Sequence, residues 1–166
     1  MIELPDLTEA AAKVAAFEGF RAGPYLDSAG IPTIGYGTTH YPWGYAVTLA
    51  DKLISEPMAL VYLRHDLGDA DQNLGRFVRA APTMNEWSAI LSLAYNVGWL
   101  PISRSTLLRN FNNGAISSAA AQFLVWDKAV VDGRLVAVPG LLNRRKAESA
   151  LFLTPDSPLT NQGAIQ

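Results

Sequence analysis

The sequence contains no cysteine, only two histidines and no long apolar run. Without cysteine, the fold has no disulfides and the chain has neither a thiolate metal site nor a thiol nucleophile. His40 and His65 are too few and too far apart in sequence for a metal site, so we expect no metal and no cofactor. The apolar stretches are interrupted well short of the roughly 18 residues of a membrane span, which predicts a soluble chain without stable membrane insertion.

The sequence also has no excess of basic residues: it contains 13 Lys and Arg and 15 Asp and Glu, which gives a net charge of −2. Proteins that bind nucleic acid usually carry many more basic than acidic residues, so we expect no nucleic-acid partner. Residues 1–75 hold 10 acidic and 4 basic residues (−6), and residues 76–166 hold 5 and 9 (+4), which together give the −2. This asymmetry could direct a positive face at an anionic polymer, or could reflect ordinary solvated helix faces.

The N-terminal segment 1–6 has Glu3 and Asp6 where an export signal would carry Lys or Arg, and no apolar run follows it. The sequence therefore predicts no signal peptide and a protein that first resides in the cytoplasm. A length of 166 residues with 49% hydrophobic content is enough for one well-buried core. We expect a single domain over residues 1–166.

Apolar residues recur at helical spacing over most of the chain, which predicts a mainly α-helical protein. The first expected helix runs from Thr8 to Phe20, with Thr8 or Asp6 as its cap. A long helix capped by Ser55 follows, ending by Pro82 or at a bend before it, and an almost entirely apolar central helix comes next. The remaining expected helices are Asn85 to Val97 (the central one), Ser103 to Phe111, Ala115 to Trp126 and Gly140 to Leu153.

Short strand-like runs surround an Asp-Ser-Ala-Gly turn between residues 25 and 37, which predicts a small β-hairpin. Residues 38–47 have no clear periodicity and form either a third strand or a loop. The expected fold class is α+β, mainly α, with a small β-lobe (about 21–50), a larger helical lobe (1–20 and 51–153) and a cleft between them. The polar tail, 154–166, is expected to pack on the surface or to be disordered.

Two carboxylates in unlike surroundings suggest glycosidic bond cleavage, which needs a proton donor and a second group that activates water. Glu18 follows apolar residues at the end of the first expected helix, where burial and the helix dipole disfavour its charged form, as a general acid requires. Asp27 lies in a turn that is more open to water and is expected to stay ionised. Their spacing alone also fits a helix-end charge and a turn-forming Asp.

Thr33 follows Asp27 by six positions and is expected to lie across the hairpin from it. Strand alternation separates its face from that of Ile34, which would leave the Thr33 hydroxyl free to hold a water against the Asp27 carboxylate. Gly35 and Gly37 would let a bulky polymer approach the backbone.

The strings Phe-Glu-Gly-Phe at 17–20, Tyr-Leu-Asp-Ser-Ala-Gly at 25–30 and Thr-Ile-Gly-Tyr-Gly at 33–37 resemble the N-terminal signature of phage-type lysozymes, glycoside hydrolase family 24. Glu18, Asp27 and Thr33 match the spacing of that family's catalytic Glu, Asp and Thr without insertion. The similarity continues in the family's order through most of residues 10–153, with matching segments at 94–98, 105–108, 123–126 and 139–148.

The resemblance implies a phage or prophage endolysin: an inverting muramidase that cleaves the β-1,4 bond between N-acetylmuramic acid and N-acetylglucosamine in bacterial peptidoglycan. Such a protein would act as a monomer and, lacking a readable signal anchor, would need a holin pore to pass from the host cytoplasm to the periplasm and cell wall. Asn96, Tyr36 and Arg144 are the expected substrate-binding residues, with Arg144 approaching Glu18 from the C-terminal helix. Residues 144–146 could instead form a solvated basic cluster.

Some features depart from the family pattern. Residues 38–47 are rich in aromatics that could stack on sugar rings or simply cover the small lobe, and the second is our expectation. The acidic total differs from the basic charge often found in the family. Two other functions stay open at this point: a lytic transglycosylase, which forms 1,6-anhydro products, and a non-catalytic wall-binding module.

Overall fold

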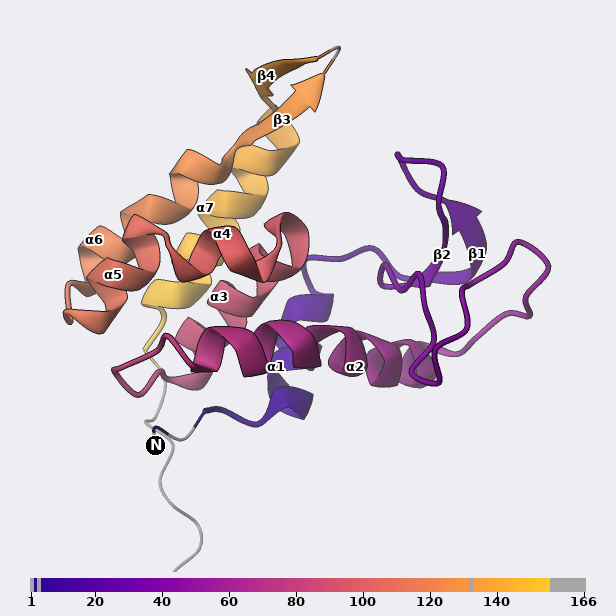
Figure 1. The fold of residues 1–166 in the computed structure, drawn as a ribbon, viewed down its shortest axis with the longest axis horizontal. Helices are drawn as coiled ribbons and strands as arrows, with labels where there is room; N and C mark the ends of the chain where they lie inside the picture. The colour runs from indigo at the N-terminus through magenta and orange to yellow at the C-terminus, as the bar shows by residue number, and fades with distance from the viewer. Residues whose placement is uncertain (1, 3, 132, 156–166) are drawn as a thin grey trace, which may run out of the picture.

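The computed structural model describes residues 2, 4–131 and 133–155, and the part of the predicted tail from residue 156 onward lies outside this set. Helices dominate the described chain, and two small antiparallel sheets accompany them (Figure 1). The elements are α1 (Leu7–Ala15), β1 (Arg21–Leu26), β2 (Pro32–Gly35), α2 (Glu56–Gly75), α3 (Met84–Val97), α4 (Trp99–Ser103), α5 (Thr106–Asn112), α6 (Ile116–Ala121), the 3-10 helix η1 (Gln122–Trp126), β3 (Lys128–Val131), β4 (Arg134–Ala137) and α7 (Pro139–Leu153).

The first helix is shorter than its apolar pattern predicts. Asp6 caps α1 by accepting hydrogen bonds from the backbone N–H groups of Thr8 and Glu9, which decides between the two expected caps. The helix ends at Ala15, and the following turn is closed by bonds to the third preceding residue, including Glu18 N–H to Ala15 O at 3.1 Å. The expectation that Glu18 closes the helix is therefore wrong, since it lies in the segment that leads from α1 to β1.

The predicted N-terminal hairpin is confirmed. Strands β1 and β2 pair antiparallel, with Tyr25 opposite Thr33. The segment 38–47 forms a loop stabilised by the isolated bridge His40–Ala46 rather than a third strand. The hairpin lies beside the first half of α2, and Figure 1 shows it on the side of the molecule away from α5 and α6.

The predicted central helix, α3, packs against α1, α2, α4 and α7. Thr83 and Glu86 form a capping box at its N-terminus, and Ser55 caps α2 as predicted. The Trp87 side chain is fully buried, and its indole N–H donates to Asp71 of α2 at 2.8 Å. The buried apolar residues of these helices form one cluster that also includes Tyr36 next to β2.

The region after α3 differs from its prediction in two places. The expected helix 103–111 begins later than predicted, as α5, because Ser105 caps it by accepting from Leu108 N–H, and the separate short helix α4 before it was not predicted. A second hairpin, β3–β4, was not predicted; it projects from the helical part with Val130 and Leu135 exposed (Figure 1). The expected helix 115–126 ends as the 3-10 helix η1, whereas the C-terminal helix is confirmed as α7. Within the described ranges, every helix is too short or too polar to traverse a bilayer.

The contact between the first hairpin and α2 can be tested at Gly35. Its φ of +66° is costly for other residues, and a Cβ there would lie 3.0 Å from the Ala59 Cβ. We expect Gly35→Ala to lower the free energy of unfolding by about 2 to 4 kcal/mol, measured by urea denaturation. Gly30→Ala is the control, since its φ is +77° but no atom lies within 4 Å of the added methyl. Its cost should be about 1 to 2 kcal/mol, and equal costs at both positions would contradict close packing of the hairpin on α2.

Candidate active site

Glu18 lies between α1 and β1 and is largely enclosed, with 18% of its side chain exposed. The Nη2 group of Arg144, on α7, donates to Glu18 Oε1 at 2.5 Å. This charged hydrogen bond joins two residues 126 positions apart in the chain. The expected approach of Arg144 to Glu18 is therefore confirmed.

Arg144 is held by three further contacts. Its Nη2 group also donates to the backbone and side-chain oxygens of Ser92 on α3, at 3.3 and 3.2 Å, and its Nε group donates to Glu148 at 2.9 Å. Burial acts to lower the pKa of Arg144, but the hydrogen bonds and charges of Glu18 and Glu148 outweigh it and raise that pKa above its usual value. The guanidinium is therefore a fixed positive charge beside Glu18.

Arg145 belongs to the same network but points into the protein and is fully buried. Its Nη1 group donates to Glu148 Oε2 at 2.5 Å, and its Nη2 group donates to the side-chain oxygen of Asn96, at the end of α3. Burial is the main reason why the pKa of Arg145 lies below its usual value. The alternative of a solvated cluster at 144–146 is wrong for Arg145, although Lys146 is exposed.

Asp27 follows β1 and organises the turn of the first hairpin. Its Oδ1 atom accepts from the backbone N–H groups of Ala29 and Ile31, at 2.8 and 2.9 Å. Its own backbone N–H donates to Ile31 O at 3.0 Å. The side chain is partly exposed, and within the described part of the chain Oδ2 has no hydrogen-bond partner, so one carboxylate oxygen is fixed and the other is available.

Thr33 lies in the same turn region as Asp27 but is oriented differently from the expectation. It pairs with Tyr25, not with Asp27, and only 2% of its surface is exposed. Its hydroxyl donates to Ile31 O at 2.9 Å, so Asp27 and Thr33 bind the same residue. The expectation of a free Thr33 hydroxyl is wrong, because the hydroxyl donor helps to close the hairpin turn.

The other expected substrate-binding residues have different environments. Asn96 is exposed, although its side-chain oxygen is used by Arg145. Tyr36 is buried against Phe20, and its hydroxyl donates to Glu56 at 2.7 Å. Burial, followed by the effect of Glu56, raises the pKa of Tyr36 to about 12. Tyr36 thus connects the hairpin to the start of α2, and a direct contact with substrate stays a prediction for Asn96, Tyr36 and Arg144.

The aromatic residues of the loop 38–47 pack on α2. The Tyr41 and Trp43 rings stack at 4.9 Å, and both meet the edge of Tyr62, at 5.4 and 5.8 Å. The Tyr41 hydroxyl also donates to Asp51 at 2.7 Å. Tyr41 and Trp43 thus join the loop to α2, but Trp43 and Tyr45 are 59% and 74% exposed, so the expectation that the aromatics cover the small lobe stays a prediction.

Sequence reasoning missed Glu148 and Ser92, which connect the site to the core. Glu148 is fully buried and accepts from Arg144, Arg145 and the Ser92 hydroxyl, the last at 2.7 Å. The only sequence signal was the spacing of three and four residues from the two arginines to Glu148 on one helix. No group of His, Cys, Asp or Glu suited to a metal ion occurs within residues 2, 4–131 and 133–155.

The fold matches solved structures of phage enzymes. The endolysin from Escherichia coli O157:H7 phage FAHEc1 superposes with a TM-score of 0.82 and 32% sequence identity, covering 92% of this chain and 94% of that one. A mainly helical α+β fold with a glutamate held by a largely enclosed arginine, and a second carboxylate on the adjacent hairpin, defines the class: a lysozyme-type glycoside hydrolase.

The family assignment is more specific. Residues 15–148 match the family model described as phage lysozyme, and the chain belongs to this family. The endolysin of Acyrthosiphon pisum secondary endosymbiont phage 1 is 38% identical over 136 residues, which are 82% of this chain and 89% of that protein. The endolysin of Salmonella phage P22 is 36% identical over 137 residues, 82% of this chain and 90% of its own length. The predicted family is confirmed.

Glu148 provides a test of the buried network. Glu148→Gln removes the carboxylate that pairs with the fully buried Arg145 and the largely enclosed Arg144, so we expect the free energy of unfolding to fall by about 3 to 5 kcal/mol. Glu9→Gln is the matched control, because Glu9 forms an exposed pair with Lys13 at 3.9 Å, whose loss should change stability by less than about 1 kcal/mol. Chemical denaturation of both variants measures the difference. A Glu148→Gln variant as stable as the control would contradict a structural role for this charge.

Proposed function

We propose that this protein is an endolysin that hydrolyses the β-1,4 bond between N-acetylmuramic acid and N-acetylglucosamine of peptidoglycan with inversion. The observation that carries the proposal is that the side chains of Glu18 and Asp27 are held by different kinds of partner. Glu18 is held at one oxygen by the largely enclosed Arg144, whereas Asp27 is held at one oxygen by backbone N–H groups in a partly exposed turn. Inverting glycosidases use two such groups, about 6.5 to 9.5 Å apart.

In this mechanism Glu18 is the general acid. Its Oε1 atom is bound by Arg144, and Oε2 has no hydrogen-bond partner among the described residues, so Oε2 is the atom that carries the proton to the leaving glycosidic oxygen. The transfer leaves Glu18 negatively charged. Arg144 then stabilises that charge, because its guanidinium is already fixed by Ser92 and Glu148 and needs no rearrangement.

Asp27 is the general base in the same step. Its Oδ2 atom accepts a proton from the water that attacks the anomeric carbon on the face opposite the leaving group. The N–H groups of Ala29 and Ile31 fix Oδ1 and thereby orient the carboxylate. Thr33 is buried and donates to the Ile31 carbonyl, so it acts in this mechanism as a positioning residue that shapes the turn holding Asp27.

Two other functions are less well supported. A lytic transglycosylase uses the 6-hydroxyl of the sugar itself in place of water, and it has no need of a second carboxylate in the position of Asp27. A non-catalytic wall-binding module has no need of a glutamate fixed by a buried arginine. The Asp27 turn therefore favours hydrolysis, and the Glu18–Arg144 pair favours catalysis.

The biological role follows from the names of the relatives, which are endolysins. In this role the protein accumulates as a monomer in the host cytoplasm, reaches the periplasm and cell wall through a holin pore, and acts on peptidoglycan. Cleavage of the peptidoglycan then removes the wall's mechanical support against osmotic pressure, and the cell lyses.

Substitution of the two carboxylates tests the assignment. Glu18→Gln and Asp27→Asn should each lower the rate of lysis of chloroform-treated Gram-negative cells by at least about a hundredfold, because each removes a proton-transfer group. Glu9→Gln, in the same helix region, should lyse at the wild-type rate. Near-ultraviolet circular dichroism checks that the variants are folded. A folded Glu18→Gln variant with the activity of the control would refute its role as the acid.

The reaction products test hydrolysis and inversion separately from the residue roles. Purified peptidoglycan should yield muropeptides with reducing muramic acid ends, each heavier by one water than a 1,6-anhydro product, as measured by mass spectrometry. Early in the reaction, NMR should show the α-anomer in excess, because inversion converts a β-linkage to an α-hemiacetal. Anhydro ends would show a transglycosylase, and an initial excess of the β-anomer would show retention.

A further inference from the structure

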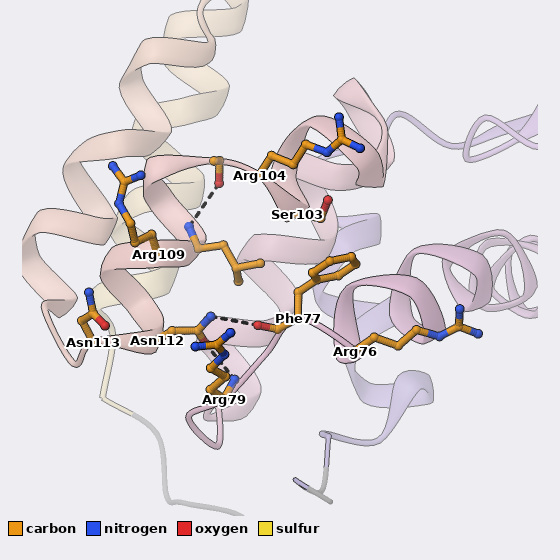
Figure 2. Close-up of a pocket in the computed structure, with 10 residues that line it drawn as sticks. Arg76, Phe77, Arg79, Ser103, Arg104, Arg109, Asn112 and Asn113 are labelled. Atoms are coloured by element: carbon orange, nitrogen blue, oxygen red, sulfur yellow. Dashed lines mark hydrogen bonds between the residues drawn. The ribbon is translucent and has the colours of Figure 1, made fainter.

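A basic pocket, distinct from the candidate active site, lies where the turn after α2 meets α4 and α5 (Figure 2). Its volume is about 310 Å³, at the lower end of the range for sites that bind small molecules. None of the residues of the Glu18, Asp27 and Arg144 site lines it. The residues that line it include Arg76, Phe77, Arg79, Arg104, Arg109 and Asn112.

The pocket carries positive charge without nearby compensation. Four of its lining residues are arginines, and no Asp or Glu lines it. In the part of the chain that the structure describes, none of the four guanidiniums is in salt-bridge distance of a carboxylate, although Arg109 donates to Thr106 at 3.0 Å. These four supply much of the +4 charge of residues 76–166. Figure 2 shows the four guanidiniums pointing in different directions around the hollow, and their unpaired charges give it a positive potential that attracts an anion.

The two sides of the pocket are joined by Asn112 of α5. Its amide N–H donates to the carbonyl of Phe77 at 2.8 Å, and its side-chain oxygen accepts from the backbone N–H of Arg79 at 2.7 Å. Both bonds are drawn in Figure 2. They fix the turn after α2 against α5, so the backbone that bears the arginines of both segments surrounds one hollow, and the flexible guanidiniums can turn toward a ligand in it.

Phe77 adds an apolar surface to this site. Its side chain is 44% exposed although it belongs to the turn that Asn112 fixes. An exposed ring beside cations provides a face on which the C–H groups of a pyranose can pack, while guanidiniums bind phosphate by paired hydrogen bonds. A simple inorganic anion has no apolar surface that could pack against the Phe77 ring.

We propose that the pocket binds a phosphorylated sugar, with the arginines on the phosphate and Phe77 against the sugar ring. The ligand is a sugar phosphate group of the bacterial envelope, carried either by a polysaccharide or by a glycolipid headgroup. Binding there anchors the enzyme to the envelope at a position separate from the scissile bond. The inference is independent of the proposed reaction, because it requires neither Glu18 nor Asp27.

Binding can be measured directly with N-acetylglucosamine 1-phosphate by NMR titration of the full chain. Inorganic phosphate and unphosphorylated N-acetylglucosamine are the comparison ligands. The double variant Arg79→Gln/Arg104→Gln should weaken binding of the sugar phosphate by about tenfold or more, since each charged contact to phosphate contributes strongly. Neither side chain donates a hydrogen bond within the described residues, so folding should be preserved, as checked by thermal melting.

Two further variants separate charge from site. Arg64→Gln/Arg134→Gln removes the same charge at exposed positions outside the pocket and should leave the affinity unchanged. Phe77→Ala should lower the affinity for the sugar phosphate severalfold while leaving the affinity for inorganic phosphate unchanged. Glu18→Gln should bind the sugar phosphate like the wild type even where it abolishes lysis, which distinguishes failure of this site from failure of the reaction.

Several results would overturn the proposal. Absence of saturable binding, or equal losses in the pocket and control double variants, would show only diffuse attraction. Equal affinity for inorganic phosphate, with no effect of Phe77→Ala, would show an anion site without sugar recognition. Binding to phosphatidylglycerol vesicles that depends on the pocket arginines, without binding of the soluble sugar phosphate, would show a membrane surface instead. Vesicles that carry a phosphorylated glycolipid, compared with the soluble ligand, distinguish the two envelope sources.

Discussion

A charged group that is removed from water must find its partners inside the protein, and this constraint governs the centre of the structure. In α7, the neighbouring residues Arg144 and Arg145 lie about one helical turn before Glu148. Arg145 and Glu148 are fully buried. Glu148 accepts from both arginines, and Glu18, which comes from the opposite end of the sequence, accepts from Arg144. Removing any one of them would leave an uncompensated charge, so the network tolerates a single arrangement.

The same constraint explains why the central helix α3 is not entirely apolar. Ser92 is fully buried, but its hydroxyl donates to Glu148 and its oxygens accept from Arg144, so its polarity is satisfied across the contact with α7. Asn96 repeats the arrangement one turn later by accepting from Arg145. These contacts fix the rotation of α7 about its own axis, which hydrophobic packing alone leaves less defined. That rotation directs the Arg144 side chain toward Glu18.

Much of this architecture could be predicted from the sequence, for reasons that differ between elements. A helix such as α2 can be predicted because its capping residue, Ser55, marks where it begins and its apolar residues recur at helical spacing. The β3–β4 hairpin was missed because its strands are four residues each and lie at the surface, where no buried face imposes alternation. The end of α1 was missed because Phe17 and Phe20 extend the helical period past the turn that follows Ala15.

For the site, the sequence strings around Glu18, Asp27 and Thr33 indicated the family, but the contacts of these residues required the three-dimensional structure. A buried Arg145–Glu148 pair and an exposed Glu9–Lys13 pair have the same kind of sequence spacing, so burial distinguishes them only after folding. Thr33 was placed opposite Asp27 by simple counting. The actual register pairs it with Tyr25, because the turn closes between Asp27 and Ile31.

The hydrogen bond between Glu18 and Arg144 spans 126 residues, and this separation has a consequence for biosynthesis. A ribosome that adds about 5 to 20 residues per second needs about 6 to 25 s to reach Arg144 after it has incorporated Glu18. During that interval the N-terminal glutamate has no guanidinium to hold it. The Glu18–Arg144 hydrogen bond therefore forms only near the end of translation, after α7 has been synthesised.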